Sequence, residues 1–305
     1  MNRICYLAIL PLCLSLIACQ SKPVDTSQDM TAAAPSQHAE VAERISVTGF
    51  SGPESVRYDP ELDVYFVGNF NGESSGDSNG FVSKMSPAGE IIELKFMQGG
   101  DYAPLHGARG MYADKNGLWV VDALGVHLFD RISGAQLGFV DLSSFDPGFP
   151  NDVVRGPDGA LYVTDTGQAV VYRIVDGTAT VATSTAMRPN GITFNPETGR
   201  LLLAPWSDGD ALVEWDIADG SFTELPAFSG GSNYDGVEVV DGQIITASQG
   251  DTSLHILTDG TDRSAIKLPG KPADIAIDTR RQRVAVPYVS LHQVDIIPLE
   301  PYLAP

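Results

Sequence analysis

The sequence predicts an all-β fold, a six-bladed β-propeller whose ring is closed by an N-terminal strand that completes the last blade. One phrase recurs six times between Ser46 and Leu299: a small residue, an apolar pair, a turn containing Gly or Asp, and an apolar strand. Successive copies open 38 to 55 residues apart, a period typical of four-stranded blades rather than of helical repeats or βαβ units. The opening residues are Glu54, Arg109, Asn151, Asn190, Asp235 and Ala273.

The beginning of the chain, residues 1–18, is expected to be a lipoprotein signal peptide. Arg3 supplies the positive start, and the apolar run after it is too short and too interrupted by Pro11 to span a bilayer. The phrase Leu16-Ile17-Ala18-Cys19 resembles a bacterial lipobox, in which Cys19 becomes the lipid-bearing first residue. An ordinary cleaved signal is the alternative.

The residue after Cys19 bears on the destination of the exported chain. Gln20 is not Asp, which by resemblance to Gram-negative lipoproteins favours the outer membrane, facing the periplasm. Several acyl chains on one residue would anchor the protein stably. All three cysteines lie within residues 1–19, so the rest of the chain has no thiol for a disulfide, a nucleophile or a zinc-thiolate site.

Composition divides the rest of the chain into two parts. Residues 19–43, the lipidated Cys and a stretch rich in Ser, Gln, Thr, Ala and Pro, are expected to form a flexible tether, and residues 44–305 the propeller. The formal net charge of −20 repels phosphate backbones and anionic lipid heads. Nucleic acid is therefore excluded as a partner, and membrane contact is expected through the lipid anchor only. A protein partner is left undefined.

The two ends of the propeller are expected to share one blade. Only 32 residues follow Ala273, enough for about three strands, of which His292–Leu299 is the last. Arg44–Phe50 alternates apolar with polar residues and can supply the missing outer strand. Such closure removes the exposed edges that an open sheet would present.

Four of the six openings offer a hard oxygen: Glu54, Asn151, Asn190 and Asp235. The inner strand of each blade runs along the central channel, so equivalent residues converge on the axis. Two carboxylates and two amides suit one divalent cation, with calcium the first choice, and leave positions for water or a substrate. The alternative is that Asn and Asp merely cap the preceding turns.

The second strand of each blade ends on the same face as the first begins. We expect these ends to surround the metal site, as support for the ligands, as substrate contacts or simply as turn residues. Trp206 is the best candidate for a pocket wall because an indole supplies apolar area and an N–H donor. Residues 71–80 are expected to form a mobile rim loop on this face. The strand ends are Asn69, Asp122, Asp165, Trp206, Ser248 and Tyr288.

The phrases GPESVRYDP, FPNDVVRGPDGALYVTDTG, RPNGITFNP and YDGVEVVDG resemble the regucalcin and gluconolactonase family of six-bladed propellers, with paraoxonases more distant. The resemblance covers the chain after the tether. It implies that Glu54, Asn190 and Asp235 bind calcium and that Asn151 binds substrate or completes the metal shell. Two departures weigh against sugar-acid lactones and paraoxonase chemistry: Phe149 replaces an Arg common in gluconolactonase relatives, and Arg109 replaces the paraoxonase catalytic His.

The resulting hypothesis is a calcium-dependent hydrolase of lactones or related esters, in which the metal polarises the carbonyl and a carboxylate activates water. The resemblance makes Asp235 the base and Glu54 mainly a ligand. Arg109 would stabilise an oxyanion or bind a substrate carboxylate, or simply pair with an acid. His106 would contact substrate or act as a base, or be a surface residue. The alternative function is a non-catalytic, metal-stabilised propeller that binds a small molecule or a protein at the envelope.

Overall fold

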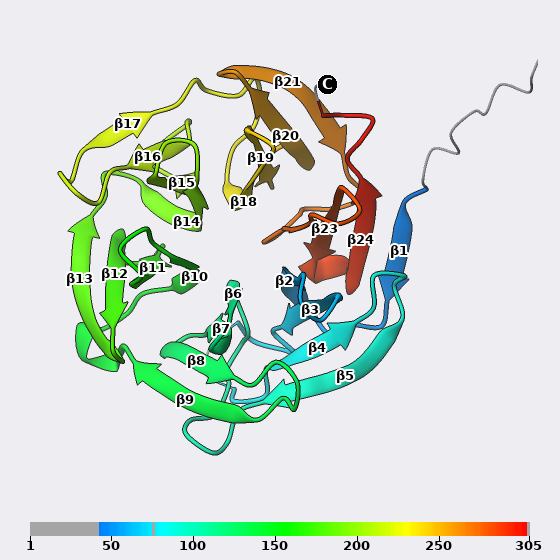
Figure 1. The fold of residues 1–305 in the computed structure, drawn as a ribbon, viewed down its shortest axis with the longest axis vertical. Helices are drawn as coiled ribbons and strands as arrows, with labels where there is room; N and C mark the ends of the chain where they lie inside the picture. The colour runs from blue at the N-terminus through cyan, green and yellow to red at the C-terminus, as the bar shows by residue number, and fades with distance from the viewer. Residues whose placement is uncertain (1–42, 75–76, 304–305) are drawn as a thin grey trace, which may run out of the picture. The chain divides into compact units, whose positions relative to one another are not determined.

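The computed structural model describes residues 43–74 and 77–303. This part of the chain forms six antiparallel sheets of four strands each, set around a common centre (Figure 1). The first strand of each blade lies near the axis and the last at the rim. The predicted six-bladed β-propeller is therefore confirmed. The predicted signal peptide, Cys19 and most of the tether lie outside the described residues.

The blades follow one another in chain order. Within blades 1 to 5 the strands also run in chain order from the axis to the rim, whereas in blade 6 the outermost strand is β1. Blades 1 and 2 comprise β2 (Pro53–Asp59), β3 (Val64–Asn69), β4 (Phe81–Met85), β5 (Ile91–Gln98), β6 (Met111–Asp114), β7 (Gly117–Val121), β8 (Gly125–Phe129) and β9 (Gln136–Asp141). Blades 3 and 4 comprise β10 (Pro150–Arg155), β11 (Leu161–Asp165), β12 (Val170–Val175), β13 (Thr178–Ser184), β14 (Arg188–Asn195), β15 (Arg200–Ser207), β16 (Val213–Trp215) and β17 (Phe222–Glu224). Blades 5 and 6 comprise β18 (Tyr234–Val240), β19 (Gln243–Ser248), β20 (Ser253–Thr258), β21 (Thr261–Lys267), β22 (Ala276–Asp278), β23 (Arg283–Tyr288), β24 (Gln293–Pro298) and β1 (Ile45–Thr48).

The ring closes through the last blade, as predicted. Strand β1 pairs antiparallel with β24, from Ile45 opposite Ile296 to Thr48 opposite Gln293, so the two chain ends share one sheet. Val47 and Phe50 are buried against blades 1 and 6. Without β1, β24 would expose a full edge of unpaired backbone groups.

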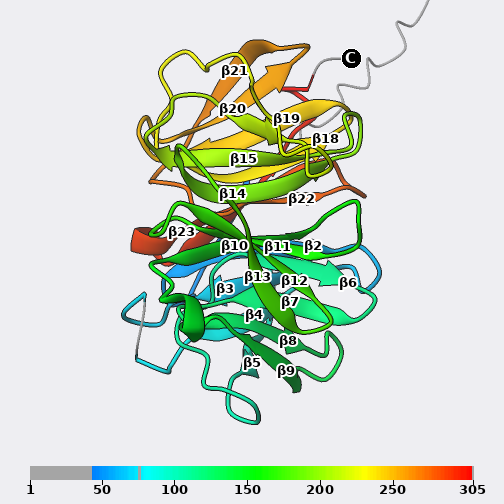
Figure 2. The same ribbon diagram turned by 90° about the vertical axis from the view of Figure 1, so that its left-hand side faces the viewer.

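The core is a ring of six apolar clusters, one at each interface between neighbouring blades. The second strands β3 and β11 are buried along their whole length because both of their faces pack against adjacent sheets. Figure 2 shows the blades stacked face to face with no helical layer between them. Within the described residues, no helix is long and apolar enough to cross a membrane.

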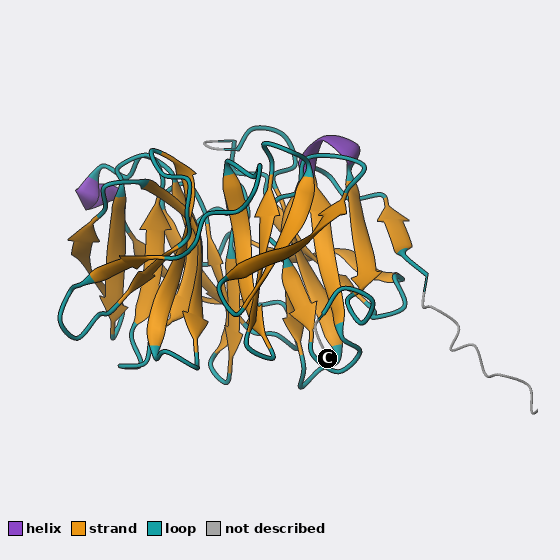
Figure 3. Cartoon of the chain, turned by 90° about the horizontal axis from the view of Figure 1, so that it is seen from above, coloured by secondary structure: helices purple, strands orange, loops and turns teal. Residues whose placement is uncertain are grey.

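Two short 3-10 turns mark one face of the ring, the upper face in Figure 3. They are η1 (Ser143–Phe145), just before the inner strand β10, and η2 (Val289–Leu291), just after β23. Inner strands begin on this face and second strands end on it. This is the face where the sequence places the candidate metal site.

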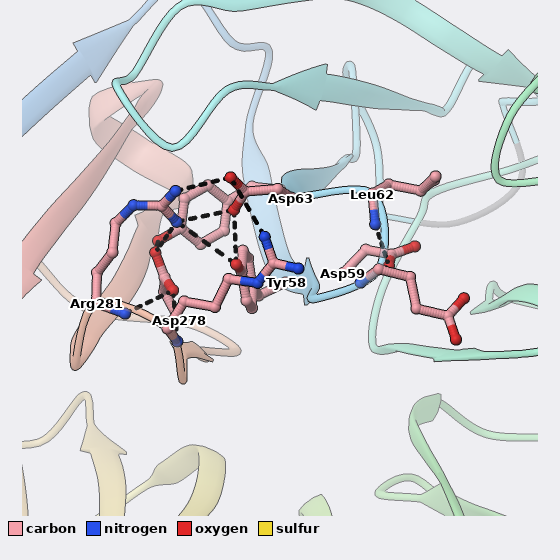
Figure 4. A network of polar contacts seen from close by, with 9 residues as sticks. Tyr58, Asp59, Leu62, Asp63, Asp278 and Arg281 are labelled. Carbon is pink, nitrogen blue, oxygen red and sulfur yellow. Dashed lines mark hydrogen bonds and ion pairs between the residues drawn. The ribbon is translucent and has the colours of Figure 1, made fainter.

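The opposite face carries a polar network that joins blade 1 to blade 6 (Figure 4). Arg281 donates to both carboxylate oxygens of Asp63, at 2.8 and 2.7 Å, and to Asp278 at 3.0 Å. The Tyr58 hydroxyl donates to Asp63 Oδ1 at 2.7 Å. These bonds join the β2–β3 turn of blade 1 to the β22–β23 turn of blade 6, the blade that closes the ring.

We predict that a chain starting at Ser51 loses cooperative thermal unfolding, whereas a chain starting at Glu43 keeps it, because only the latter retains β1. The measurement is a thermal melt followed by near-UV circular dichroism. Equal melting profiles would show that β1 contributes nothing to closure.

Candidate functional site

The four candidate ligands lie in backbone irregularities of the same kind. The register of the inner strand shifts at Pro53/Ser55, Pro150/Val153, Pro189/Ile192 and Tyr234/Val237, stretches that contain or border Glu54, Asn151, Asn190 and Asp235. Such bulges re-aim side chains and are common beside active sites. In three of the four blades a proline precedes the candidate ligand, and bulges tolerate proline because the ladder is already interrupted there.

The inner strands approach one another so closely at these openings that their backbones are bonded between blades. Gly110 N–H donates to the Asn151 carbonyl and Asp274 N–H to the Glu54 carbonyl, both at 2.9 Å. A Cβ added at Gly191 would lie 2.2 Å from the Asp235 carbonyl oxygen, inside contact distance. The glycine after Asn190 is therefore required by the neighbouring blade.

All four candidate ligands line one cavity of about 310 Å³. Each is nearly buried, at 3 to 5% exposure, and each has a buried oxygen without a hydrogen-bond partner in the described part of the chain. Buried polar atoms are rarely left unpaired, because the loss of hydration is not repaid. The four unpaired atoms are Glu54 Oε2, Asn151 Oδ1, Asn190 Oδ1 and Asp235 Oδ1.

The remaining polar atoms of Asn151 and Asp235 are held in place. Asn151 Nδ2 donates to Thr166 Oγ1 at 3.2 Å, and Thr166 donates in turn to the Pro189 carbonyl at 2.7 Å. Gln249 Nε2 donates to Asp235 Oδ2 at 2.8 Å. The unpaired oxygens of these two side chains are thus the atoms left over once the supporting hydrogen bonds are made.

The two carboxyl groups have perturbed pKa values. Burial, and next the Asp235 charge, raise the pKa of Glu54 well above its usual value, and Arg109 opposes this. Burial raises the pKa of Asp235 to about 7, against the hydrogen bond from Gln249. In the absence of a cation, burial therefore makes both carboxyl groups hold their protons to a higher pH than they would in water.

These residues fit a hard divalent cation. Their unpaired atoms are two carboxylate and two amide oxygens, the donor type that calcium prefers. No group of three or more His, Cys, Asp or Glu side chains could hold a metal within the described ranges, so the site needs its two amides. Thiolate and imidazole sites, which favour zinc and copper, do not fit this donor set.

The walls of the cavity come from every blade except blade 2. They include the four candidate ligands and the predicted Trp206. In four blades, however, the wall residue lies one position beyond the strand end that the sequence indicated. The further wall residues are Phe70, Phe149, Thr166, Gln249, Ala273 and Val289.

The strand ends themselves mostly serve local turns. Asp165 accepts hydrogen bonds from the backbone of Gly148, Phe149 and Gln168, and Asp122 from that of His106, Leu124 and Gly125. Asn69, Ser248 and Tyr288 are likewise bonded within their own blade or its entry loop. These contacts agree with a role as turn residues, one of the three roles that the sequence left open for these positions.

Arg109 lies behind a cavity wall rather than in it. Its guanidinium donates to the Pro150 carbonyl and, at 2.8 Å, to the Ser74 carbonyl in the rim loop. The guanidinium carbon is 3.6 Å from the centre of the Phe149 ring. Burial lowers the pKa of Arg109 to about 10, against the effect of Glu54, so it remains a cation at neutral pH.

His106 also lies outside the cavity lining. Its backbone N–H donates to Asp122 at 3.1 Å, and its ring lies 3.3 Å from the Ser78 hydroxyl. The buried His127 instead contacts Asp122 at 2.9 Å and the Gln136 amide at 2.7 Å. These contacts hold the entry to blade 2.

Two buried carboxyl groups near the site were not identified from the sequence. Asp152 and Asp274 each directly follow a repeat opening, and both are almost completely buried. Burial raises the pKa of Asp152 to about 7 and, with Asp152 as the next cause, raises that of Asp274 well above its usual value. Their position in the repeat was the available signal, but strand alternation predicts that residues after the openings face away from the channel.

The fold is shared with enzymes and with a calcium-binding protein. A gluconolactonase from Xanthomonas campestris superposes with a TM-score of 0.67 at 17% identity, over 84% of this chain and 89% of that one. A calcium-binding regucalcin from Agrobacterium tumefaciens gives 0.59 at 19% identity, over 78% and 82%. Virginiamycin B lyase from Staphylococcus aureus gives 0.56 at 15% identity, over 84% and 99%.

These similarities define the class of protein as a six-bladed propeller of the gluconolactonase and regucalcin type of fold. No family model and no curated relative matches the chain. At such low identity the likeness concerns the fold alone, and the three neighbours are named for different activities. The choice among functions therefore depends on the site itself.

We predict that the contribution of Asp235 to the free energy of unfolding of the metal-free protein falls as the pH rises from about 4 to 7. The folded pKa of Asp235, about 7, lies above its unfolded value of about 4, so the folded state holds more protons across this window. Asp235→Asn should remove this part of the pH dependence and leave the parts due to Glu54, Asp152 and Asp274, as measured by chemical denaturation in chelator.

Calcium should act in the opposite direction, because it competes with protons for the carboxylates. At 100 times its Kd at pH 8, calcium should add about 2.7 kcal/mol to the free energy of unfolding, and the same calcium concentration should add less at pH 5. A melting temperature unmoved by calcium at both pH values would argue against the metal site.

Proposed function

We propose that this protein is a calcium-dependent hydrolase of lactones or related esters. The observation that carries the proposal is the set of four unpaired, nearly buried oxygens from four blades in one cavity. Such a set suits a cation, and the open cavity beside it leaves room for a small substrate. The proposal extends the fold-level likeness to a gluconolactonase and a calcium-binding regucalcin.

Glu54, Asn151, Asn190 and Asp235 would hold the cation. When bound, calcium would supply a Lewis acid for the substrate carbonyl. Glu54 and Asp235 provide the negative charge, while the two amides provide neutral oxygens. The Asn151 amide group is oriented by Thr166, so its oxygen faces the cavity without rearrangement.

We assign the general base to Asp235. Its Oδ2 is fixed by Gln249 and its Oδ1 is unpaired, so Oδ1 would accept the proton of the attacking water. Burial raises the pKa of Asp235 to about 7 in the metal-free protein and a bound cation would lower it again, so the assignment of the base is supported by the unpaired Oδ1 and by the family resemblance. Glu54 is assigned mainly as a ligand.

The substrate would contact Asn151 and Trp206, which line the cavity. Arg109 and His106 take indirect roles in this proposal. Arg109 positions Phe149 by stacking on its ring, and His106 belongs to the hydrogen-bonded entry of blade 2. Both lie outside the lining, so neither is assigned a contact with the reacting carbonyl.

A non-catalytic binding propeller remains the second candidate, and one observation favours it. Among the eleven described residues that line the cavity, only Glu54 and Asp235 carry carboxyl groups, none is a histidine, and both carboxyl groups are candidate ligands. A hydrolase must therefore use a ligand as its base. In a binding protein the same ion would simply order the face of the ring.

The proposed setting is the periplasmic face of a bacterial outer membrane, with the chain anchored by lipid on Cys19. This proposal rests on the lipobox-like phrase, and the choice of the outer membrane rests on Gln20 after Cys19. A partner protein is not proposed.

We predict that Asp235→Asn lowers kcat/KM for a hydrolysed lactone about 10²- to 10⁴-fold, the usual contribution of a general base. The measurement is proton release with calcium and with chelator, repeated over a range of calcium concentrations. Activity regained at high calcium would show that Asp235 is only a ligand.

The matched control is Asp219→Asn, the same change on an exposed turn of blade 4. It should leave turnover unchanged. Absence of turnover in the parent protein, together with a calcium-stabilised melt, would favour the binding propeller.

A further inference from the structure

Apart from the four candidate ligands, the cavity lining is largely apolar. Phe70, Phe149, Trp206, Ala273 and Val289 come from blades 1, 3, 4 and 6. A substrate whose ester group reaches the four oxygens must therefore place the rest of its structure against these walls.

The polar wall residues are already engaged with the site. The Thr166 hydroxyl donates to the Pro189 carbonyl and accepts from Asn151. The Gln249 amide donates to Asp235. Beyond these bonds, the wall offers a polyhydroxylated ring chiefly the remaining amide atoms of Gln249 and the indole N–H of Trp206, and hydroxyl groups left unpaired on entry cost free energy.

No cation lines the cavity in the part of the chain that the structure describes. The nearest candidate, Arg109, is 1% exposed, lies against the Phe149 ring at 3.6 Å, and donates to two backbone carbonyls. A substrate carboxylate or phosphate would thus find no side chain of opposite charge. It would also meet a protein whose formal net charge is −20.

We propose that the cavity takes neutral lactones or esters that carry an aliphatic or aromatic group, and discriminates against sugar-acid lactones and acidic esters. This inference rests on the proposed function for the reaction, but its discrimination arises from the walls alone. Phe149 and Trp206 are the specificity-determining residues. The volume of about 310 Å³ limits the ligand to a small molecule.

The test compares γ-lactones with alkyl chains of increasing length, glucono-1,5-lactone and a succinate half-ester, all with calcium. Each added methylene that enters the apolar cavity should raise kcat/KM about threefold to fourfold, until the cavity is full. Phe149→Ser and Trp206→Ser should remove this dependence on chain length, mainly through KM. Phe222→Ser, an exposed aromatic on β17, is the matched control and should leave the series unchanged.

A second readout separates this inference from the proposed reaction. The melting temperature of the calcium-loaded protein is measured with gluconamide and with γ-lactams that carry the same alkyl chains. Lactams are less prone to hydrolysis than lactones. Stabilisation that rises with chain length and is lost in Phe149→Ser supports the inference, whether or not any lactone is hydrolysed. If no lactone is hydrolysed, that result refutes only the proposed hydrolase. Faster turnover of gluconolactone, or equal stabilisation by gluconamide, overturns the inference and leaves the hydrolase standing. If no probe is turned over and none stabilises the protein, both the inference and the proposed function are overturned.

Discussion

The candidate site depends on how closely the six inner strands approach one another around the axis. The backbone bonds between blades, such as Asp274 N–H to the Glu54 carbonyl, bring neighbouring openings into direct contact. Glycine is required at Gly191 for this reason. The bulges at the openings then direct one polar side chain from each of four blades toward the same space.

This convergence has an electrostatic consequence. Burying Glu54 and Asp235 together costs free energy unless a positive charge or a proton accompanies them. Arg109 provides part of the compensation for Glu54, but its hydrogen bonds go to backbone carbonyls. The raised pKa values of both carboxyl groups, and of Asp152 and Asp274 close by, express the remaining imbalance. A divalent cation among the four oxygens would offset it directly.

The fold and the set of converging oxygens could be predicted because both depend on periodicity. Residues at the same place in each repeat must reach the same height on the axis, whatever the details of packing. The wall residues could not be predicted as well, since a shift of one position turns a side chain to the other face of its strand. Phe70 and Thr166 line the cavity, whereas Asn69 and Asp165 bond to local backbone. Asp152 was missed because the bulge at β10 interrupts the expected alternation.

By itself, the sequence determined the number of blades, the use of both chain ends in one blade, and the four positions that share the channel. Each follows from a pattern along the chain that local strand chemistry and repetition define. Only the tertiary structure decided that Arg109 lies behind Phe149, that none of the described wall residues comes from blade 2, and that the walls are largely apolar. These features arise from contacts between blades, where the position of one side chain depends on residues distant in sequence.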